Sequence, residues 1–366
     1  MSERKIKSLY IHIPFCEHLC DYCDFPKVQY FSLFARSYIK ELKKELDSYH
    51  IPSDLETIYI GGGTPTSLED DLFLELLMML EKYTRNIKEY TFEANPESLS
   101  IAKMEMMKKF GVNRISIGVE TTNDDILKSI NRHHTFMDVK NAVLNAQKLG
   151  FDNLNVDLIL GLPGASLEQL RQDLVKLIDL NVQHISCYSL TVHPNTVFFL
   201  KGIKEPLDDD VRVYYDYVHN FLAEHGFRHY EVSNWSKPGF ESKHNMTYWK
   251  NEHYYGVGLG ASGYIDNVRY TNTKSINEYL KGKHLDYQEV VECTDDIEYQ
   301  IMLNLRTKEG LDLKEFKNKY DFDLYQNKKD IIDDLVRNGY LVISNEKLIP
   351  TYEGMMTLDQ IVLKLI

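Results

Sequence analysis

The sequence lacks several features that would place it in whole classes of protein. No apolar run approaches the roughly 20 residues that a membrane-spanning helix needs. Met1–Lys7 leads directly into a predicted strand without the apolar core of a signal peptide, so we expect a cytoplasmic protein. The 42 basic residues are outnumbered by 55 acidic ones. The net charge of −13 argues against nucleic acid as a partner, because phosphate binding needs clustered Lys and Arg.

Cysteine is also scarce, and five cysteines are an odd number for a disulfide scaffold. Three of them fall in one short segment, at Cys16, Cys20 and Cys23. Thiolates are the usual ligands of iron–sulfur clusters, and a cubane normally takes four. Phe25 stands where a nearby fourth could sit, so a bound cubane would keep one iron without a protein ligand. Two alternatives stay open: a zinc site completed by His12 or His18, and three unconnected cysteines.

From Lys7 to Leu190, short apolar runs alternate with longer segments of helical period. The predicted strands are Ser8–Ile13, Thr57–Ile60, Tyr90–Glu93, Arg114–Ile117, Leu154–Leu160 and His184–Leu190. The predicted helices are Phe31–Tyr49, Glu69–Tyr83, Ser100–Phe110, Thr135–Leu149, Ser166–Leu180 and Asp208–His225. Such alternation is typical of right-handed βαβ units on a parallel sheet. Six units rather than eight predict an α/β fold built on a partial, TIM-like (β/α)6 barrel.

Unusual residues follow the ends of these predicted strands. In chain order they are Cys16–Cys23, Gly61–Pro65, Glu93, Gly118–Glu120 and, inside the fifth strand, Asp157. The carboxyl ends of parallel barrel strands carry the active site, so we expect these residues on one rim. Plainer interpretations exist: Gly61–Gly63 as a tight turn, Glu93 as a solvated acid, and Arg132 as a surface charge. Asp157 interrupts an apolar strand and should have a partner, because a buried unpaired carboxylate is costly.

The segment Tyr10–Cys16, with the two cysteines that follow it, resembles the signature of radical S-adenosylmethionine (SAM) proteins. More narrowly, the chain is similar over nearly its whole length to the branch holding oxygen-independent coproporphyrinogen III oxidase and a related heme chaperone. The resemblance implies a 4Fe–4S cluster whose open iron is chelated by SAM, and cleavage of SAM to a 5′-deoxyadenosyl radical. It also implies a SAM-binding set. That set is Tyr10, Gly62, Gly63, Thr64, Glu93, Glu120, Arg132 and Asp157.

Within this set, the resemblance implies that Gly62–Thr64 meets the SAM amino group, Arg132 faces the carboxylate, and Asp157 faces the ribose. Glu120 departs from the family, which usually has glutamine at this position. An ionised carboxylate accepts hydrogen bonds but cannot donate one as an amide does.

Two later segments carry further candidates. Lys243–Trp249 is by itself a polar-aromatic loop, and a lone histidine there is more often structural than a ligand. His244, Tyr248 and Trp249 nevertheless resemble an HNxxYW motif of the chaperone branch, in which a histidine could ligate heme iron and aromatic rings could face a porphyrin. The G-x-G-x-x-G pattern of Gly258–Gly263 is followed by a predicted hairpin rather than a helix, so we do not expect a dinucleotide site.

The character of the chain changes after about Cys293. Helices are predicted at Asp295–Leu305, Leu313–Tyr320, Lys328–Asn338 and Tyr352–Ile366, with a hairpin of Tyr340–Ser344 and Lys347–Thr351. We therefore expect three parts: a radical SAM core at 1–227, a β-rich extension at 228–290, and a winged-helix-like domain at 291–366. The last part is mixed in charge rather than basic, which favours a lid or a protein-docking surface over DNA binding.

Three functions are compatible with these residues. The resemblance favours a heme chaperone that carries a cluster, SAM and heme and delivers heme to acceptor hemoproteins, which could include membrane-associated respiratory enzymes. It would take electrons from a flavodoxin or ferredoxin, and it could associate peripherally with a membrane. The alternatives are a coproporphyrinogen III oxidase, which usually has another cysteine in place of Phe25, and a zinc-stabilised interaction protein.

Overall fold

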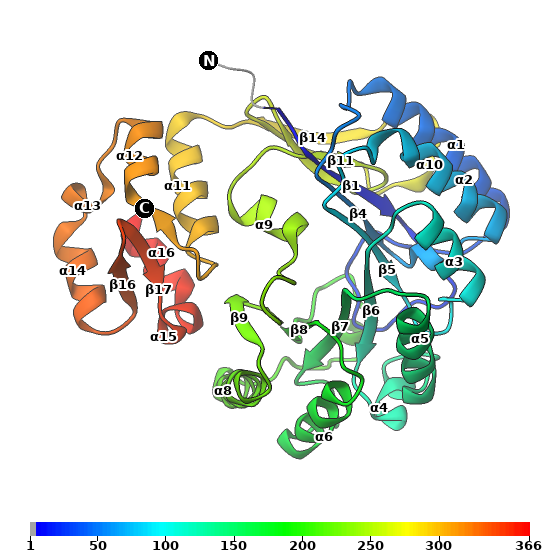
Figure 1. Cartoon of the computed structure of the whole chain (residues 1–366), viewed down its shortest axis with the longest axis horizontal. Coiled ribbons are helices and arrows are strands. Elements are labelled where there is room, and N and C mark those ends of the chain that lie inside the picture. The colour runs from blue at the N-terminus through cyan, green and yellow to red at the C-terminus, as the bar shows by residue number, and fades with distance from the viewer. Residues whose placement is uncertain (1–4) are drawn as a thin grey trace.

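The computed structural model describes residues 5–366. Residues 1–4, the first part of the Met1–Lys7 segment discussed above, lie outside the described residues. A nine-stranded sheet forms the centre, in the order β11-β1-β4-β5-β6-β7-β8-β10-β9. The bounds are β1 (Ser8–Ile13), β4 (Thr57–Gly62), β5 (Glu89–Ala94), β6 (Arg114–Glu120), β7 (Leu154–Leu160), β8 (His184–Ser189), β9 (Arg228–Glu231), β10 (Asn234–Ser236) and β11 (Tyr255–Val257). Strands β11 to β8 run parallel, whereas β10 and β9 are antiparallel additions. The sheet curves into an open barrel (Figure 1).

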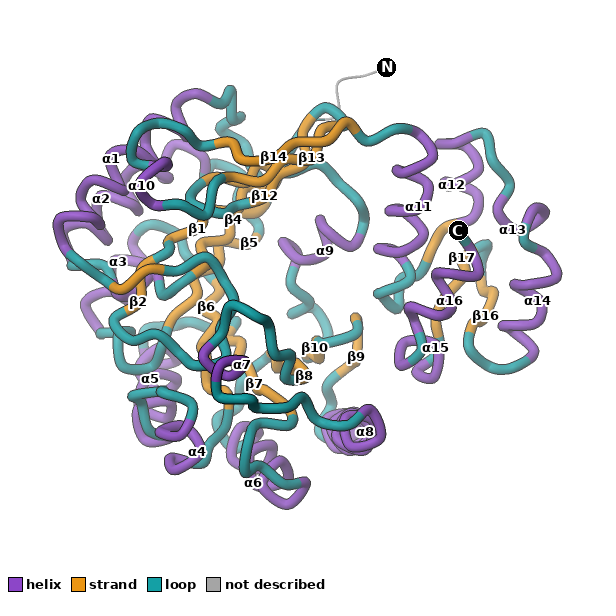
Figure 2. Tube along the Cα trace, turned by 180° about the vertical axis from the view of Figure 1, so that it is seen from behind, coloured by secondary structure: helices purple, strands orange, loops and turns teal. Residues whose placement is uncertain are grey.

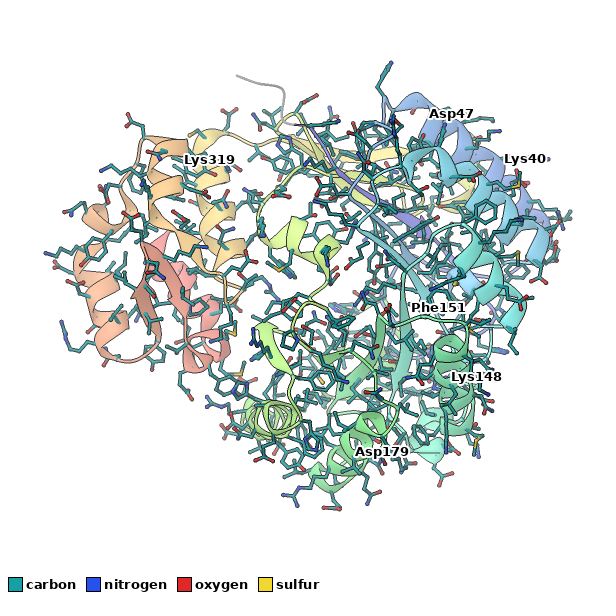
Figure 3. The ribbon with its side chains drawn as sticks, viewed as in Figure 1. Lys40, Asp47, Lys148, Phe151, Asp179 and Lys319 are labelled. Carbon is teal, nitrogen blue, oxygen red and sulfur yellow. The ribbon has the colours of Figure 1, made fainter. Side chains whose placement is uncertain are left out.

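Helices cover the outer face of this sheet (Figures 1 and 2). They are α1 (Ser32–Ser48), α2 (Asp70–Leu80), α3 (Ile101–Lys109), α4 (Asp124–Ser129), α5 (Phe136–Lys148), α6 (Leu167–Ile178) and α8 (Asp208–Glu224). Helix α1 shows the pattern: Leu42 and Leu46 are buried, while Lys40 and Asp47 point outward (Figure 3). The main hydrophobic core therefore lies between the helices and the sheet.

The predicted strands and helices of the barrel are confirmed, with differences only at their ends. The structure adds two short helices that were not predicted, α4 and α7 (Val197–Leu200). Each is too short to show a helical period in the sequence, and each begins at a capping side chain, Asn123 and Thr196 respectively.

The segment that was interpreted as a polar-aromatic loop is instead a helix, α9 (Lys243–Trp249), which begins where the Ser242 hydroxyl accepts a hydrogen bond from the Asn245 amide. The predicted hairpin after the glycine-rich turn is confirmed. Strands β12 (Ser262–Ile265) and β13 (Val268–Asn272) pair across Asp266 and Asn267, both with positive φ, as a type I′ turn requires. A third strand, β14 (Leu285–Val290), and the short α10 (Ile276–Tyr279) complete this layer.

The carboxy-terminal unit has a hydrophobic core of its own. It contains α11 (Cys293–Asn304), β15 (Leu311–Asp312), α12 (Leu313–Tyr320), α13 (Leu324–Asn327), α14 (Lys329–Arg337), β16 (Leu341–Ser344), β17 (Lys347–Pro350), α15 (Tyr352–Met356) and α16 (Leu358–Leu365). Strand β15 joins the predicted hairpin in an antiparallel sheet of order β15-β17-β16. The three domain boundaries given above stay predictions.

One prediction here was wrong: the final helix is not continuous but breaks at Thr357, where φ is −123°. The two halves pack against different surfaces. Gly354 of α15 lies so close to the hairpin that a Cβ would be 2.0 Å from the Tyr340 carbonyl oxygen, whereas α16 buries Ile361 and Leu365 in the core of the unit. Within residues 5–366, no helix is both long and apolar enough to cross a bilayer.

Candidate functional site

A cavity of about 430 Å³ opens at the carboxyl ends of the parallel strands and continues down into the barrel. Most of the predicted site residues line it. These are Cys16, Cys20, Cys23, Gly62, Gly63, Thr64, Glu93, Glu120, Arg132 and Asp157. Tyr10, His244, Tyr248 and Trp249 do not line it, although Asn245 of the same motif does. The cavity is within the range of sites for small molecules.

The cysteine loop leaves the barrel through β2 (Phe15–Cys16), which pairs in parallel with β3 (Val28–Gln29). None of the three cysteines forms a disulfide. Burial raises the pKa of Cys16 to about 12 and also raises that of Cys23, so a metal would have to displace their protons on binding. Two groups already face the sulfurs: the Thr64 hydroxyl is 3.6 Å from Cys16 Sγ, and Arg132 Nη1 is 3.6 Å from Cys20 Sγ.

The donor set suits iron–sulfur chemistry, because three thiols from one short loop face the same cavity. Among residues 5–366, no three His, Cys, Asp or Glu side chains are drawn together closely enough to hold a metal ion as they stand. Assembly of a cluster would therefore draw the three sulfurs of this loop together.

Gly62 and Gly63, in the loop that follows β4, allow this loop to lie very close to the segment that leads into the cysteine loop. Gly62 has φ of 118°, and a Cβ there would lie 2.7 Å from His12 Nε2. A Cβ on Gly63 would lie 2.8 Å from the Phe15 carbonyl oxygen and 2.9 Å from Cys16 Sγ. A turn alone would require only the positive φ, whereas this contact requires the missing side chain as well. The loop is packed directly against the cysteine loop.

Glu93 lies next to the carboxyl end of β5, and its carboxylate is already hydrogen-bonded. The Tyr59 hydroxyl donates to one oxygen at 2.7 Å, and the Gly62 amide donates to the other at 3.0 Å. Removal from bulk water raises the pKa of Glu93 to about 7. A cationic group entering the cavity would favour the ionised form.

Arg132 is buried and makes several contacts at the rim. Its guanidinium donates to Asn95 Oδ1 at 3.0 Å and to the Gly118 carbonyl at 2.6 Å, and it lies 3.3 Å from Glu120 Oε1. The Tyr22 hydroxyl also donates to this Glu120 oxygen, at 2.7 Å. Glu120 adopts φ of 63° at an irregularity in the β6–β7 pairing, and burial raises its pKa, with Arg132 opposing the shift. The surface-charge interpretation of Arg132 is therefore wrong.

Asp157 has the partners that its burial demands. The Asn155 amide donates to one oxygen at 2.7 Å and the Ser116 hydroxyl to the other at 3.2 Å, and burial raises the pKa of the carboxyl. Sequence reasoning missed these partners. Other cavity-lining residues that it missed are Tyr22, Tyr59, Asn95, Arg114 and Ser186. The sequence did contain a signal for these residues, because polar side chains alternate with apolar ones along two strands. Arg114 and Ser116 on β6, and Asn155 and Asp157 on β7, are spaced by two and share one face of the sheet.

Helix α9 closes the opposite end of the barrel, beside the amino-terminal ends of β1, β4 and β5. The Glu89 carboxylate accepts hydrogen bonds from the backbone amides of Lys243 and His244 at 2.8 and 2.9 Å, which holds the start of the helix in place. His244 is fully buried. Its Nδ1 lies 2.8 Å from the Thr57 hydroxyl and its Nε2 lies 2.8 Å from the Tyr248 hydroxyl.

The last residue of the motif points to a different neighbour. The Trp249 ring stacks with the Arg306 guanidinium at 4.6 Å, and its carbonyl accepts a hydrogen bond from Asn304 at 2.8 Å, so it contacts the carboxy-terminal unit. Heme binding by His244, Tyr248 and Trp249 stays a prediction. Ligation of iron by His244 would require breaking one of its two hydrogen bonds and opening the barrel floor.

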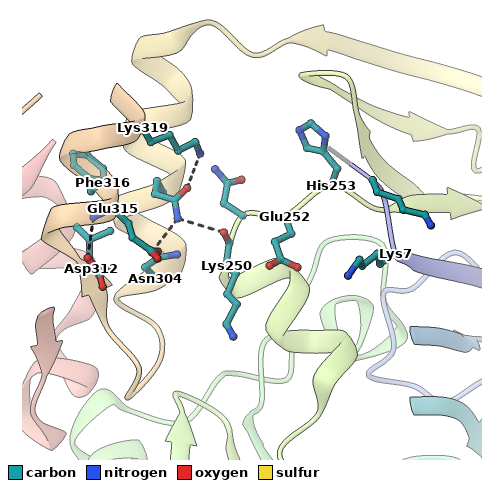
Figure 4. Close-up of a pocket in the computed structure, with 13 residues that line it drawn as sticks. Lys7, Lys250, Glu252, His253, Asn304, Asp312, Glu315, Phe316 and Lys319 are labelled. Carbon is teal, nitrogen blue, oxygen red and sulfur yellow. Dashed lines mark hydrogen bonds between the residues drawn. The ribbon is translucent and has the colours of Figure 1, made fainter. Parts of the chain in front are cut away.

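A second cavity, of about 480 Å³, lies between α9 and the helices α11 and α12 of the carboxy-terminal unit (Figure 4). Several lysines line it, but acidic neighbours already neutralise them: Lys7 pairs with Glu56, and Lys250 lies 3.1 Å from Glu309. No cysteine lines this cavity, and none of its lining residues lies at the carboxyl ends of the parallel strands. It is a gap between two packed units rather than part of the site.

Comparisons with known proteins agree with this geometry. Residues 10–177 match the model of the radical SAM superfamily, and residues 293–357 match the HemN C-terminal domain. The structure superimposes on a coproporphyrinogen III oxidase (HemN) from Escherichia coli, described as a radical SAM enzyme, with a TM-score of 0.86 at 20% identity. That match covers 100% of this chain and 91% of the other, and it establishes the fold.

The fold and the family match over residues 10–177 identify a radical SAM protein. Two curated relatives narrow the assignment, and both are named heme chaperone HemW. The protein from Lactococcus lactis is 39% identical over 96% of this chain and 95% of its own length, and the one from Bacillus subtilis is 38% identical over 95% and 96%. The chain belongs to the HemW family of radical SAM proteins.

Proposed function

We propose that this protein is a heme chaperone that carries a 4Fe–4S cluster and SAM, binds heme, and delivers it to acceptor hemoproteins. Two observations support the proposal. Relatives with that name match the chain over nearly its full length, and three thiols, four carboxylates and two arginines line one cavity at the carboxyl ends of the strands.

We propose that Cys16, Cys20 and Cys23 hold the cluster. When bound, the cluster and SAM together supply one-electron chemistry. The chain's own task is to shape the cavity around them: the missing side chain of Gly63 lets the second loop lie against Cys16, and Thr64 places its hydroxyl 3.6 Å from that sulfur.

We propose that SAM occupies the adjoining part of the cavity. Glu93, together with the loop Gly62–Thr64, would receive the amino group, Arg132 the carboxylate, and Asp157 the ribose hydroxyls. Glu120 has its own role in this arrangement, since its carboxylate is bound by Tyr22 and lies beside Arg132. It would hold the guanidinium in position rather than contact SAM as glutamine could. Tyr10 would act indirectly, because its hydroxyl is 3.0 Å from His12 Nδ1 and the residue does not line the cavity.

The test of this proposal is heme transfer. The full chain is reconstituted anaerobically with iron and sulfide, loaded with heme, and mixed with an apo-hemoprotein under separate conditions with and without SAM and a reductant. We expect stable heme uptake followed by transfer to the acceptor. A protein that takes up no heme would overturn the chaperone function.

The second candidate is coproporphyrinogen III oxidase, favoured by the structural match to HemN. Phe25 stands where the oxidase pattern has another cysteine, which argues against it. Incubation of the reconstituted protein with coproporphyrinogen III, SAM and a reductant separates the two functions, and formation of protoporphyrinogen IX would establish the oxidase.

A zinc-stabilised interaction protein is distinguished by colour. An iron–sulfur protein absorbs broadly in the visible range, whereas Zn²⁺ is a d¹⁰ ion without such bands.

We also propose particular partner proteins. The acceptors would be membrane-associated respiratory enzymes, reached by peripheral association with the membrane, and the electron donor would be a flavodoxin or ferredoxin. Pull-down of such acceptors by the heme-loaded protein but not by the heme-free protein would support this assignment.

A further inference from the structure

The loop that follows β8 presents a histidine at the mouth of the cavity. His193 lines the cavity, and its side chain is 44% exposed. The loop is ordered around it, because the His193 carbonyl accepts hydrogen bonds from the Thr196 amide at 3.0 Å and the Thr196 hydroxyl at 2.6 Å. An imidazole held on a fixed backbone at an open rim can reach a ligand without rearrangement of the barrel.

A carboxylate orients this imidazole. His193 Nε2 lies 3.3 Å from Asp24 Oδ2, whereas Nδ1 has no hydrogen-bond partner among residues 5–366. Metal-binding histidines typically hold a carboxylate with one ring nitrogen and the metal with the other, because the carboxylate fixes the ring and makes it more basic. Asp24 and His193 are placed for this arrangement, with a carboxylate oxygen 3.3 Å from one ring nitrogen and the other nitrogen available.

The surroundings of His193 are unusually apolar for a surface. Phe25, next to Asp24, is 63% exposed, and on α7 Phe199 and Leu200 are 51% and 81% exposed. Below them, Leu190 and Phe198 belong to a buried apolar cluster that also contacts Tyr22 of the cysteine loop. Phe25 lines the cavity, and α7 is docked on the same cysteine loop, because the Phe198 amide donates to the Asp21 carbonyl at 3.0 Å. Exposed apolar side chains beside a cavity indicate a binding surface. Lys204 lies in the loop after α7 and has no ion-pair partner among the described residues. That loop is tied to the His193 segment, because the Glu205 carboxylate accepts a hydrogen bond from the Val192 amide at 2.7 Å.

We propose that His193 is an axial ligand of the heme iron. The apolar side chains of Phe25, Phe199 and Leu200 would cover the porphyrin, and Lys204 would meet a propionate. This inference rests on the proposed chaperone function and locates its cargo at the barrel mouth rather than at α9. A flat apolar ring with an iron at its centre and carboxylates at one edge matches the chemistry of this surface in all three respects.

The alternative histidines are less suited to the role. His244 is fully buried and uses both ring nitrogens, at 2.8 Å from Thr57 and 2.8 Å from Tyr248. His18, also at the mouth, has one ring face covered by His133 at a centroid distance of 3.6 Å. Only the environment of His193 combines an available nitrogen, an orienting carboxylate and a wide apolar surface among the histidines compared.

The test uses the full chain titrated with hemin, with affinity and the absorption and paramagnetic resonance spectra as readouts. His193→Ala should weaken heme binding at least about tenfold, since even the loss of a carboxylate behind a ligand commonly costs 10- to 100-fold in metal affinity. His193→Tyr should restore binding with the spectrum of a phenolate-ligated iron. Asp24→Asn should weaken binding less and shift the ligand-field bands.

The matched control is His50→Ala, an exposed histidine just beyond the end of α1, which should leave the heme spectrum unchanged. An unaltered affinity and spectrum in His193→Ala, or the same losses from His50→Ala, would overturn the assignment. A heme spectrum that stays the same while affinity falls would also overturn it, because the residue would then be only a contact. If the unsubstituted protein takes up no heme, the chaperone function itself fails, which is a distinguishable outcome.

Discussion

The two ends of the barrel use the same residue type in opposite ways. At the mouth, His193 is 44% exposed, keeps one ring nitrogen without a partner, and lies beside three cysteines that form no disulfide. At the floor, His244 is fully buried and both of its nitrogens have hydroxyl partners. A histidine whose two ring nitrogens are both hydrogen-bonded stabilises the fold, whereas a histidine with one nitrogen that has no partner can bind a ligand. The comparison predicts that substitutions at the two ends affect different properties.

The largest effect is expected at the mouth from Cys16→Ala. Loss of one of three thiolates should abolish the cluster, so the anaerobically reconstituted protein should be nearly colourless and nearly free of iron. The urea midpoint of the cluster-free protein should change little, because the barrel floor is untouched. Cys293→Ala, which removes an exposed cysteine outside the loop, is the control and should keep the parent iron content. Full iron loading of Cys16→Ala would contradict the proposed ligand set.

His244→Ala should have the opposite effect: it should lower stability and leave cluster binding intact. This change leaves the buried hydroxyls of Thr57 and Tyr248 without their partner and opens a cavity, which should cost about 3 kcal/mol of unfolding free energy. Urea denaturation of the cluster-free protein measures it. Protein that remains folded should still take up its full complement of iron and should bind heme with an unchanged spectrum. A changed heme spectrum in this variant would instead support the axial role predicted from the HNxxYW motif.

A third expectation concerns pH and Glu93. The pKa of Glu93 in the folded protein is about 7, above the ordinary glutamate value of about 4.3 that applies to the unfolded chain. Between these values the folded state keeps a proton that the unfolded state has lost, so the stability of the ligand-free protein should fall as pH rises. The loss should be complete above pH 7 and amount to at most about 4 kcal/mol.

Glu93→Gln removes this titration, so the difference between pH 5 and pH 8 should shrink relative to the parent protein. Chemical denaturation at the two pH values measures it, and an identical pH dependence in the variant would show that other groups cause it. The amide oxygen can accept from the Gly62 amide, and the Tyr59 hydroxyl can rotate to accept from the amide nitrogen.

The smallest effect is expected where the floor meets the carboxy-terminal unit. Trp249→Leu removes the ring on which Arg306 stacks at 4.6 Å but keeps the backbone carbonyl that Asn304 contacts. We expect a loss of about 1 kcal/mol of unfolding free energy, the usual size of a cation–π contact, with no change in iron content. A loss of heme binding in this variant would be inconsistent with a purely structural role.

Much of the barrel could be predicted from the sequence, because each strand is an apolar run bounded by turns and each covering helix has a clear period. The β1 and β7 ranges agree with their predictions at both ends. The short elements could not be predicted. Helix α9 has only seven residues, and it forms because the Glu89 carboxylate, far away in the sequence, binds its first amides. Such long-range contacts leave no local signal.

The site was predictable where a motif marked it and otherwise was not. Glu93, Arg132 and Asp157 were identified by resemblance, and the structure places all three around one cavity. Their supports, such as Asn95 and Asn155, have no signature, because a hydrogen-bond partner is chosen by position in space rather than by spacing in the chain. The break at Thr357 was missed for a related reason: it reflects two packing surfaces, not a helix-breaking residue.

The inner wall of the barrel is polar along several strands, with Ser116, Asn155 and Ser186 facing the cavity, while the apolar packing lies on the outer side of the sheet. The residues that stabilise the fold and the residues that can contact a small molecule therefore lie on opposite faces of the same sheet. Replacing one inward side chain by another of similar size and hydrogen-bonding capacity leaves that apolar side untouched, so descendants of such a chain could acquire new cargo while the outer shell stays as it is.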